Sequence, residues 1–186
     1  MSDFLLELRS EEIPARMQAK ACEDLARLFT DALTDAGVEP ASIETHATPR
    51  RLALIARGLP AETPATSEER RGPRTDAPDK ALEGFLRGAG VAKDELEARE
   101  EKKGSFWYAK IETPGRAMAD ILAEAIPAIV RNFPWPKSMR WGVGSADGLK
   151  WVRPLSGIIA LLDGDVVPFE IVGIASGRTT RGHRFM

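Results

Sequence analysis

The sequence has 186 residues and a mass of 20.3 kDa, and its 43% hydrophobic and 29% charged content is typical of a globular protein. A formal net charge of −2 means that local basic clusters do not follow from a basic composition, and a single cysteine excludes an intramolecular disulfide. The start lacks the basic and apolar regions of a signal peptide, and no apolar run reaches the roughly 20 residues of a membrane span. We therefore expect a cytoplasmic protein without membrane contact.

The first third of the chain predicts one small αβ unit, residues 1–60. Apolar residues alternate or recur at helical spacing, which predicts a strand, a helix and two further strands over residues 3–8, 10–36, 42–47 and 51–57. Ser10, the acids that follow it and Pro14 have the composition of a helix start, and Gly37 is expected to end the helix.

Residues 61–78 are polar and rich in Pro, Thr, Glu and Arg, which predicts a linker or loop. Beyond it we expect a second α+β unit over 79–186, truncated at its C-terminal end. Its predicted elements are a helix at 79–89, a solvated face or hairpin arm at 93–103, a strand at 106–112, a helix at 116–130 and strands at 155–162 and 166–172. Pro127 is expected to kink or split its helix, and Asp163-Gly164 is typical of a hairpin turn. The fold class is α+β, with mixed or mostly antiparallel sheets.

Three basic clusters carry the strongest functional signal: the first cluster (48–51), the second cluster (137–142) and the third cluster (180–185). Each places Arg or Lys beside Gly, Pro or an aromatic residue. Arginine makes bidentate contacts to phosphate and aromatic rings stack on bases, so the clusters predict an RNA-binding surface. The candidates for phosphate contact are Arg50, Arg51, Lys137, Arg140, Arg153, Arg181 and Arg184, and those for base or ribose contact are Trp141 and His183.

Structural interpretations of the same residues stay open. Paired arginines at a strand start are often a solvated edge, the tryptophans between 135 and 151 can belong to the core, and His183 can be packed and hydrogen-bonded. The clusters would then form a structural or subunit-docking element without direct RNA contact.

Motifs for catalysis are weak. The sequence has no phosphate-binding loop of the Gly-x4-Gly-Lys-Ser/Thr type, and one Cys with two His is too few for a structural zinc site. Cys22 is expected to be an inert thiol on a helix, although a nucleophile pair with His46 or His183 is formally possible. Glu11-Glu12 can be an acid/base pair but is more typical of a helix start. We expect no catalytic and no metal site in this chain; a small hydrolase or editing module is a third alternative.

The motifs together resemble the N-terminal part of the β subunit of bacterial heterotetrameric glycine–tRNA ligase. The matching stretches cover almost the whole chain: residues 4–8, 10–14, 48–53, 72–73, 84–85, 137–141, 152–154 and 180–185. Between residues 74 and 83 the chain is shorter than the family pattern. The resemblance implies a non-catalytic fragment of a tRNA-binding subunit, with no cofactor of its own. It also implies an α2β2 assembly in which a separate α subunit binds ATP, with Mg, and forms glycyl-adenylate.

Overall fold

The computed structural model describes residues 1–93, 96–101, 104–141 and 148–182. These residues form helices together with mixed and antiparallel sheets, which confirms the predicted α+β class. The chain folds into two compact units: unit 1 comprises Met1–Thr63 and Arg116–Met186, and unit 2 comprises Pro64–Gly115. No helix in the described ranges is both long and apolar enough to cross a bilayer.

These units divide the chain differently from the boundaries that the sequence predicts. The predicted linker 61–78 contains a strand, β4 (Thr66–Arg74), which belongs to unit 2. The predicted second unit 79–186 is split, because its residues from Arg116 onward join the N-terminal segment. The physical reason is strand pairing: the strand formed by Leu155–Leu162 hydrogen-bonds to the first strand of the chain and so completes the first sheet.

The sheet of unit 1 has the strand order β11-β12-β9-β1-β3-β2, and β10 pairs with β9. Its strands are β1 (Ser2–Ser10), β2 (Ser42–Thr48), β3 (Arg51–Leu59), β9 (Leu155–Leu162), β10 (Asp165–Val166), β11 (Glu170–Ile171) and β12 (Ile174–Gly177). β1 is antiparallel to both β3 and β9, whereas β12 is parallel to β9. A separate antiparallel ribbon consists of β7 (Met139–Trp141) and β8 (Leu149–Trp151).

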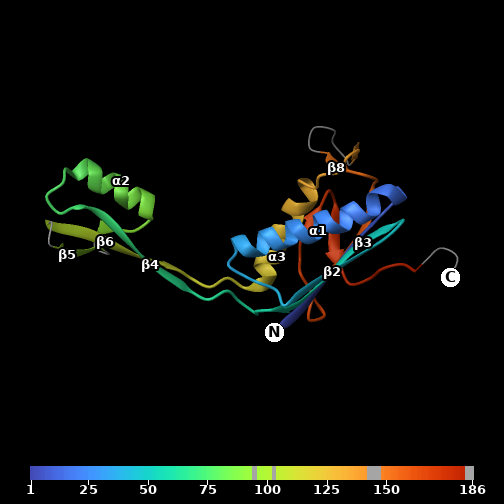
Figure 1. Ribbon diagram of the computed structural model, residues 1–186, viewed down its shortest axis with the longest axis horizontal. Helices are drawn as coiled ribbons and strands as arrows, with labels where there is room; N and C mark the ends of the chain where they lie inside the picture. Colours follow the sequence, from blue (N-terminus) through green and yellow to red (C-terminus); the bar gives the residue numbers. More distant parts are fainter. Residues whose placement is uncertain (94–95, 102–103, 142–147, 183–186) are drawn as a thin grey trace. The chain divides into compact units, whose positions relative to one another are not determined.

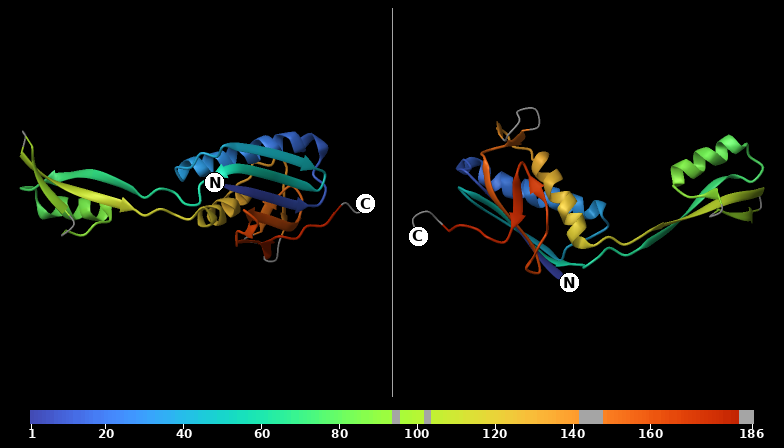
Figure 2. Two further views of the ribbon diagram at one scale, coloured as in Figure 1. Left: turned by 90° about the horizontal axis from the view of Figure 1, so that it is seen from below. Right: turned by 180° about the vertical axis from the view of Figure 1, so that it is seen from behind.

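Helices α1 (Ala15–Asp35) and α3 (Met118–Arg131) lie on one face of this sheet (Figures 1 and 2). Strand alternation directs Phe4, Leu6 and Leu8 toward the helices, where all three are buried. The Phe4 ring stacks on Phe29 of α1 with a centroid distance of 5.8 Å. Burial of one such side chain contributes about 2–3 kcal/mol, so this layer is the main source of stability in unit 1.

The structure corrects the predicted start of the first helix and excludes one of the two outcomes expected at Pro127. The first helix begins at Ala15, with Pro14 as its N-cap residue and no side chain capping it, because β1 extends through Ser10. The Ser10 N–H donates instead to the Arg50 carbonyl at 2.9 Å. Of the two outcomes expected at Pro127, a kink or a split, the split does not occur, because α3 continues from Met118 to Arg131.

The hairpin after β9 confirms the predicted Asp163-Gly164 turn. Both residues have positive φ, 50° and 90°, as a type I′ turn requires. The Asp163 carboxylate accepts a hydrogen bond from the Asp3 N–H at 2.7 Å. Hydrogen bonds from Ser2 and Asp3 lower the pKa of Asp163 because they favour its ionised form. The predicted strand 166–172 is, by contrast, two short strands, β10 and β11.

In its described residues, unit 2 consists of a three-stranded antiparallel sheet and one helix. The strand order is β4-β6-β5, with β5 (Leu96–Glu101), β6 (Gly104–Thr113) and α2 (Asp79–Ala89). The predicted helix 79–89 and strand 106–112 are confirmed. The solvated face or hairpin arm expected at 93–103 is confirmed for its described part, where β5 pairs with β6 and residues 97–100 are exposed; residues 94–95 and 102–103 lie outside the described residues. Gly72 lies so close to Phe85 of α2 that a Cβ there would be 2.7 Å from the ring. A side chain at position 72 would therefore require the Phe85 ring to shift.

Candidate nucleic-acid interface

Three sequence motifs that are far apart in the chain meet at the end of β1. The Glu11 N–H donates to the Pro154 carbonyl at 3.0 Å, and the Ile13 N–H donates to the Pro49 carbonyl at 2.5 Å. We call this place the β1 junction and define it as residues 10–13, 49–50 and 153–154. It forms because β3 and β9 flank β1, so that the β2–β3 turn and the approach to β9 lie on either side of the same strand end.

Arg50 lies at the β1 junction but is paired within the chain. Its guanidinium contacts the Glu11 carboxylate at 2.5 Å, and the two side chains are 42% and 53% exposed. Glu11 is therefore the ion-pair partner of Arg50, and it precedes α1, which begins at Ala15. Because the pair is at the surface, its contribution to stability is small, about 0–1 kcal/mol.

Arg51 connects the first and third basic clusters. Its guanidinium lies 3.6 Å from the Glu7 carboxylate and donates a hydrogen bond to the Arg181 carbonyl. The Thr180 hydroxyl donates to the other oxygen of Glu7. Glu7 and Arg51 lie on the sheet face away from the helices, so the segment around Thr180 and Arg181 crosses that face. Arg51 thus holds this segment against the sheet through its hydrogen bond to the Arg181 carbonyl, whereas the Arg181 side chain is exposed.

Lys137 and Arg153 are both exposed to solvent. Arg153 donates a hydrogen bond to the neighbouring Val152 carbonyl at 3.0 Å. Lys137 lines a shallow cavity of about 240 Å³ together with Arg16, Met17 and Pro136. Arg16, at the start of α1, is thus a basic neighbour of Lys137 that the sequence alone did not nominate.

Several cations line a cavity at the β7–β8 ribbon. A cavity of about 510 Å³ is lined by Arg131, Arg140, Gly148, Leu149, Lys150, Ile171 and Val172, and we call it the basic pocket. Three of these residues are cations, and no carboxylate is among the described residues that line it. Arg140 and Lys150 are directly opposite each other in the ribbon, and Arg131 is the last residue of α3.

The sequence identified Arg140 as a candidate, but it could not show that Arg131 and Lys150 line the same cavity. Arg131 and Lys150 are visible as cations between 131 and 153, yet their convergence on one cavity depends on two strands of three residues each. Strands this short have no periodicity to reveal the pairing.

The core interpretation is correct for two tryptophans of the second cluster's surroundings. Trp151 is 1% exposed, and its ring lies 5.0 Å from those of both Phe133 and Trp135. These rings form an aromatic cluster in which Trp151 and Phe133 are buried and Trp135 is partly buried. The side chain of Trp141, together with His183 and Arg184, lies outside the described residues, so their predicted roles stay predictions.

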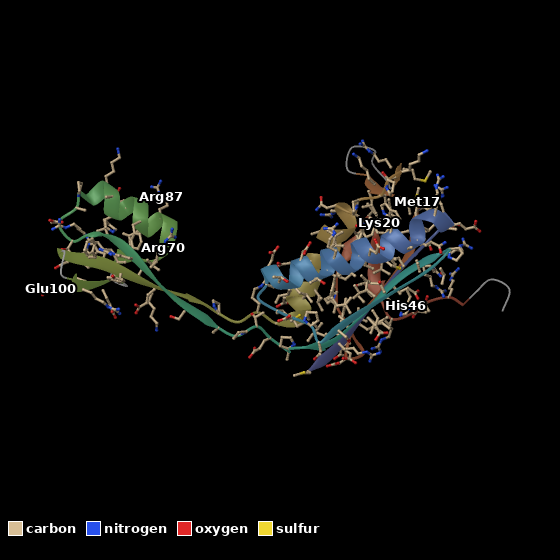
Figure 3. All side chains as sticks on the ribbon, viewed as in Figure 1. Met17, Lys20, His46, Arg70, Arg87 and Glu100 are labelled. Carbon is tan, nitrogen blue, oxygen red and sulfur yellow. The ribbon has the colours of Figure 1, made fainter. Side chains whose placement is uncertain are left out.

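The Cys22–His46 pair is excluded by geometry. Cys22 is half-buried on α1, and burial raises the pKa of its thiol, so the nucleophilic thiolate is disfavoured. The Cys22 thiol interacts with the Thr45 side chain of β2. His46, the next residue in the strand (Figure 3), points to the opposite face and is 63% exposed.

Comparison with known proteins identifies the family. Residues 4–186 match the family model described as the glycyl-tRNA synthetase beta subunit. The chain belongs to this family. Over 190 aligned residues it is 58% identical to the glycine–tRNA ligase beta subunit of Paracoccus denitrificans (strain Pd 1222) and 54% identical to that of Ruegeria sp. (strain TM1040). Each alignment covers 100% of this chain and 27% of the relative, so the chain spans about a quarter of the length of these proteins.

Proposed function

We propose that this chain is the tRNA-binding N-terminal part of a glycine–tRNA ligase beta subunit and supports the ATP-dependent attachment of glycine to its tRNA in the cytoplasm. Membership of the glycyl-tRNA synthetase beta-subunit family supports a role in the attachment of glycine to tRNA. The single structural observation that supports RNA binding is the basic pocket, where Arg131, Arg140 and Lys150 surround one cavity. The negative charge of RNA lies on its phosphate groups. When a protein's Arg or Lys side chains contact these phosphates, counterions are released, and this release favours binding.

The division of labour between subunits is part of the proposal. The adenylate chemistry, with ATP and Mg, takes place on a separate α subunit in an α2β2 assembly, and this chain contributes binding without catalysis. The name "beta subunit" in the relatives supports the existence of such a partner.

The test is a titration of the chain with glycine tRNA and with an unrelated tRNA at low and moderate salt. We expect Arg140→Ala to weaken tRNA binding several-fold and to reduce the slope of log affinity against log salt by about one, because one fewer counterion is released. Arg87→Ala is the matched control, since Arg87 is an exposed arginine of α2 in unit 2 (Figure 3) and does not line the basic pocket. An Arg140→Ala protein with an unchanged salt slope would contradict the proposal.

A second candidate function is docking of the α subunit or of another domain. The observation that favours it is that Arg50 and Arg51 are already engaged, by Glu11, Glu7 and the Arg181 carbonyl. If docking is the main role, alanine changes in the first and third clusters lower stability or α-subunit association and leave the salt dependence of RNA binding unchanged.

A further inference from the structure

The basic pocket has two chemically distinct parts. Its cations are Arg131, Arg140 and Lys150, whereas Leu149, Ile171 and Val172 supply apolar surface. We call Leu149, Ile171 and Val172 the apolar floor; Leu149 and Ile171 are 4% and 0% exposed, so the surface that this floor offers to a ligand comes mainly from the partly exposed Val172. An apolar floor with a few polar groups at one side is typical of sites that take a small organic group, and a volume of about 510 Å³ exceeds what a phosphate alone would fill.

The cations of the pocket are held close together by the fold. Arg140 and Lys150 form a directly opposed pair in the β7–β8 ribbon, and the side chains of such a pair lie on the same face, with Cβ atoms about 5 Å apart. Like charges that are directly opposed destabilise a ribbon. An anion that binds between them removes this repulsion and gains its own attraction to both, so the pocket favours an anion of high charge.

Charge distinguishes the two kinds of phosphate in RNA. A phosphodiester within the strand carries one negative charge, whereas a terminal phosphomonoester carries close to two at pH 7, since its second pKa is about 6. An internal phosphodiester also has a nucleotide on each side, but a terminal phosphate has only one. Three cations beside one apolar floor match a doubly charged phosphate that is attached to a single nucleotide.

We propose that the basic pocket binds the 5′-terminal phosphate of tRNA, with Arg131, Arg140 and Lys150 around the phosphate and its nucleotide against the apolar floor. This inference rests on the proposed function in that the ligand is tRNA. It goes beyond that function because it assigns the pocket to a single phosphate of the RNA, the one at the 5′ end of the tRNA.

The experiment compares glycine tRNA that carries its 5′-phosphate with the same tRNA after phosphatase treatment. For the unchanged chain we expect removal of the phosphate to weaken binding roughly fivefold, as loss of a charged hydrogen-bonding group does. Arg140→Ala and Lys150→Ala should weaken binding of the phosphorylated tRNA and largely abolish the difference between the two tRNAs. Arg140→Lys keeps the charge and should retain part of the difference, and Arg87→Ala should retain all of it.

The pH dependence gives an independent readout. The advantage of the 5′-phosphate should shrink as the pH falls below about 6, because the monoester then loses its second charge. A merely structural role of Arg140 would produce no such coupling between the variant, the terminal phosphate and pH.

Equal affinity of the chain for the two tRNAs overturns this inference. If binding of both tRNAs still depends on salt and on Arg140, the proposed function stands and the pocket contacts internal phosphates. If adenosine 5′-monophosphate displaces the phosphorylated tRNA as effectively as unlabelled phosphorylated tRNA does, the pocket is a site for free nucleotides, and the assignment to the tRNA end is wrong.

Discussion

At the scale of single residues, the structure separates arginines that are engaged within the chain from cations that line a cavity. Arg50 is paired with Glu11, directly after β1, whereas Arg51 contacts Glu7 of β1 and the Arg181 carbonyl, 130 positions away in the chain. The sequence could identify these arginines as candidates, but it could not show their partners, because an ion pair depends on which strands become neighbours. Arg140 was identified for the same compositional reason and does line a cationic cavity.

Two neighbouring arginines should therefore respond differently to substitution. Arg51→Ala should lower the free energy of unfolding by about 1–3 kcal/mol, because it removes a hydrogen bond from a charged donor and leaves Glu7, which is 15% exposed, without its cation. Arg50→Ala should change it by less than about 1 kcal/mol, since both Arg50 and Glu11 are well exposed. Urea unfolding of the two variants measures the difference; equal effects would show that the contact between Arg51 and the Arg181 carbonyl is unimportant.

At the scale of secondary structure, elements with a buried face could be predicted and polar or short elements could not. The buried alternation in β1 and the apolar spacing in α1 and α3 reflect contact with a core, and α2 was predicted with its observed bounds. β4 has no such pattern, because its sequence Thr66–Arg74 is polar throughout, and it forms a strand through pairing with β6. β7, β8 and β12 have only three or four residues, too few for a period.

Helix α3 contains a proline, Pro127, whose effect on stability can be tested. Pro127 lies inside the helix, where it has no N–H to donate to the carbonyl four residues earlier and its ring crowds that carbonyl. Pro127→Ala should raise the free energy of unfolding by about 1–2 kcal/mol, after the greater freedom of the unfolded alanine chain offsets part of the gain.

The matched control for Pro127 is Ala128→Gly, one position along the same helix. It should lower the free energy of unfolding by about 1 kcal/mol, as glycine does in a helix interior. Both values come from denaturant unfolding followed by circular dichroism. A Pro127→Ala protein that is less stable than the original would mean that packing of the proline ring outweighs the missing hydrogen bond.

At the scale of the whole molecule, the arrangement of units is the part of the fold that local sequence patterns could not give. A polar stretch between two apolar regions predicts a linker, and a linker predicts two consecutive domains. The topology is instead an insertion: the chain leaves unit 1 after Thr63 and returns at Arg116. The pairing of β9 with β1 reveals this insertion, and that pairing joins residues about 150 positions apart.

The insertion predicts that unit 1 folds without unit 2. The two ends of unit 1 already meet, since the Thr63 N–H donates to the Arg116 carbonyl at 2.9 Å and the Arg116 N–H donates to the Thr63 hydroxyl at 2.9 Å. An antiparallel bridge also joins Glu62 and Ala117. Among the described residues, the cluster of buried side chains that forms the core of unit 1 contains none from 64–115.

Replacing residues 64–115 by Asn-Gly, a two-residue turn that suits antiparallel ends, should therefore give a folded protein. We expect one cooperative urea transition with a free energy of unfolding within about 2 kcal/mol of that of unit 1 in the full chain, because the closure replaces a long loop by a short one and leaves the core unchanged. The basic pocket lies wholly in unit 1, so the shortened protein should also keep its dependence on Arg140 for tRNA binding. A protein that is unfolded after the replacement would show that unit 2 contributes to the core of unit 1. A folded protein that no longer binds tRNA would instead place an essential RNA contact on unit 2.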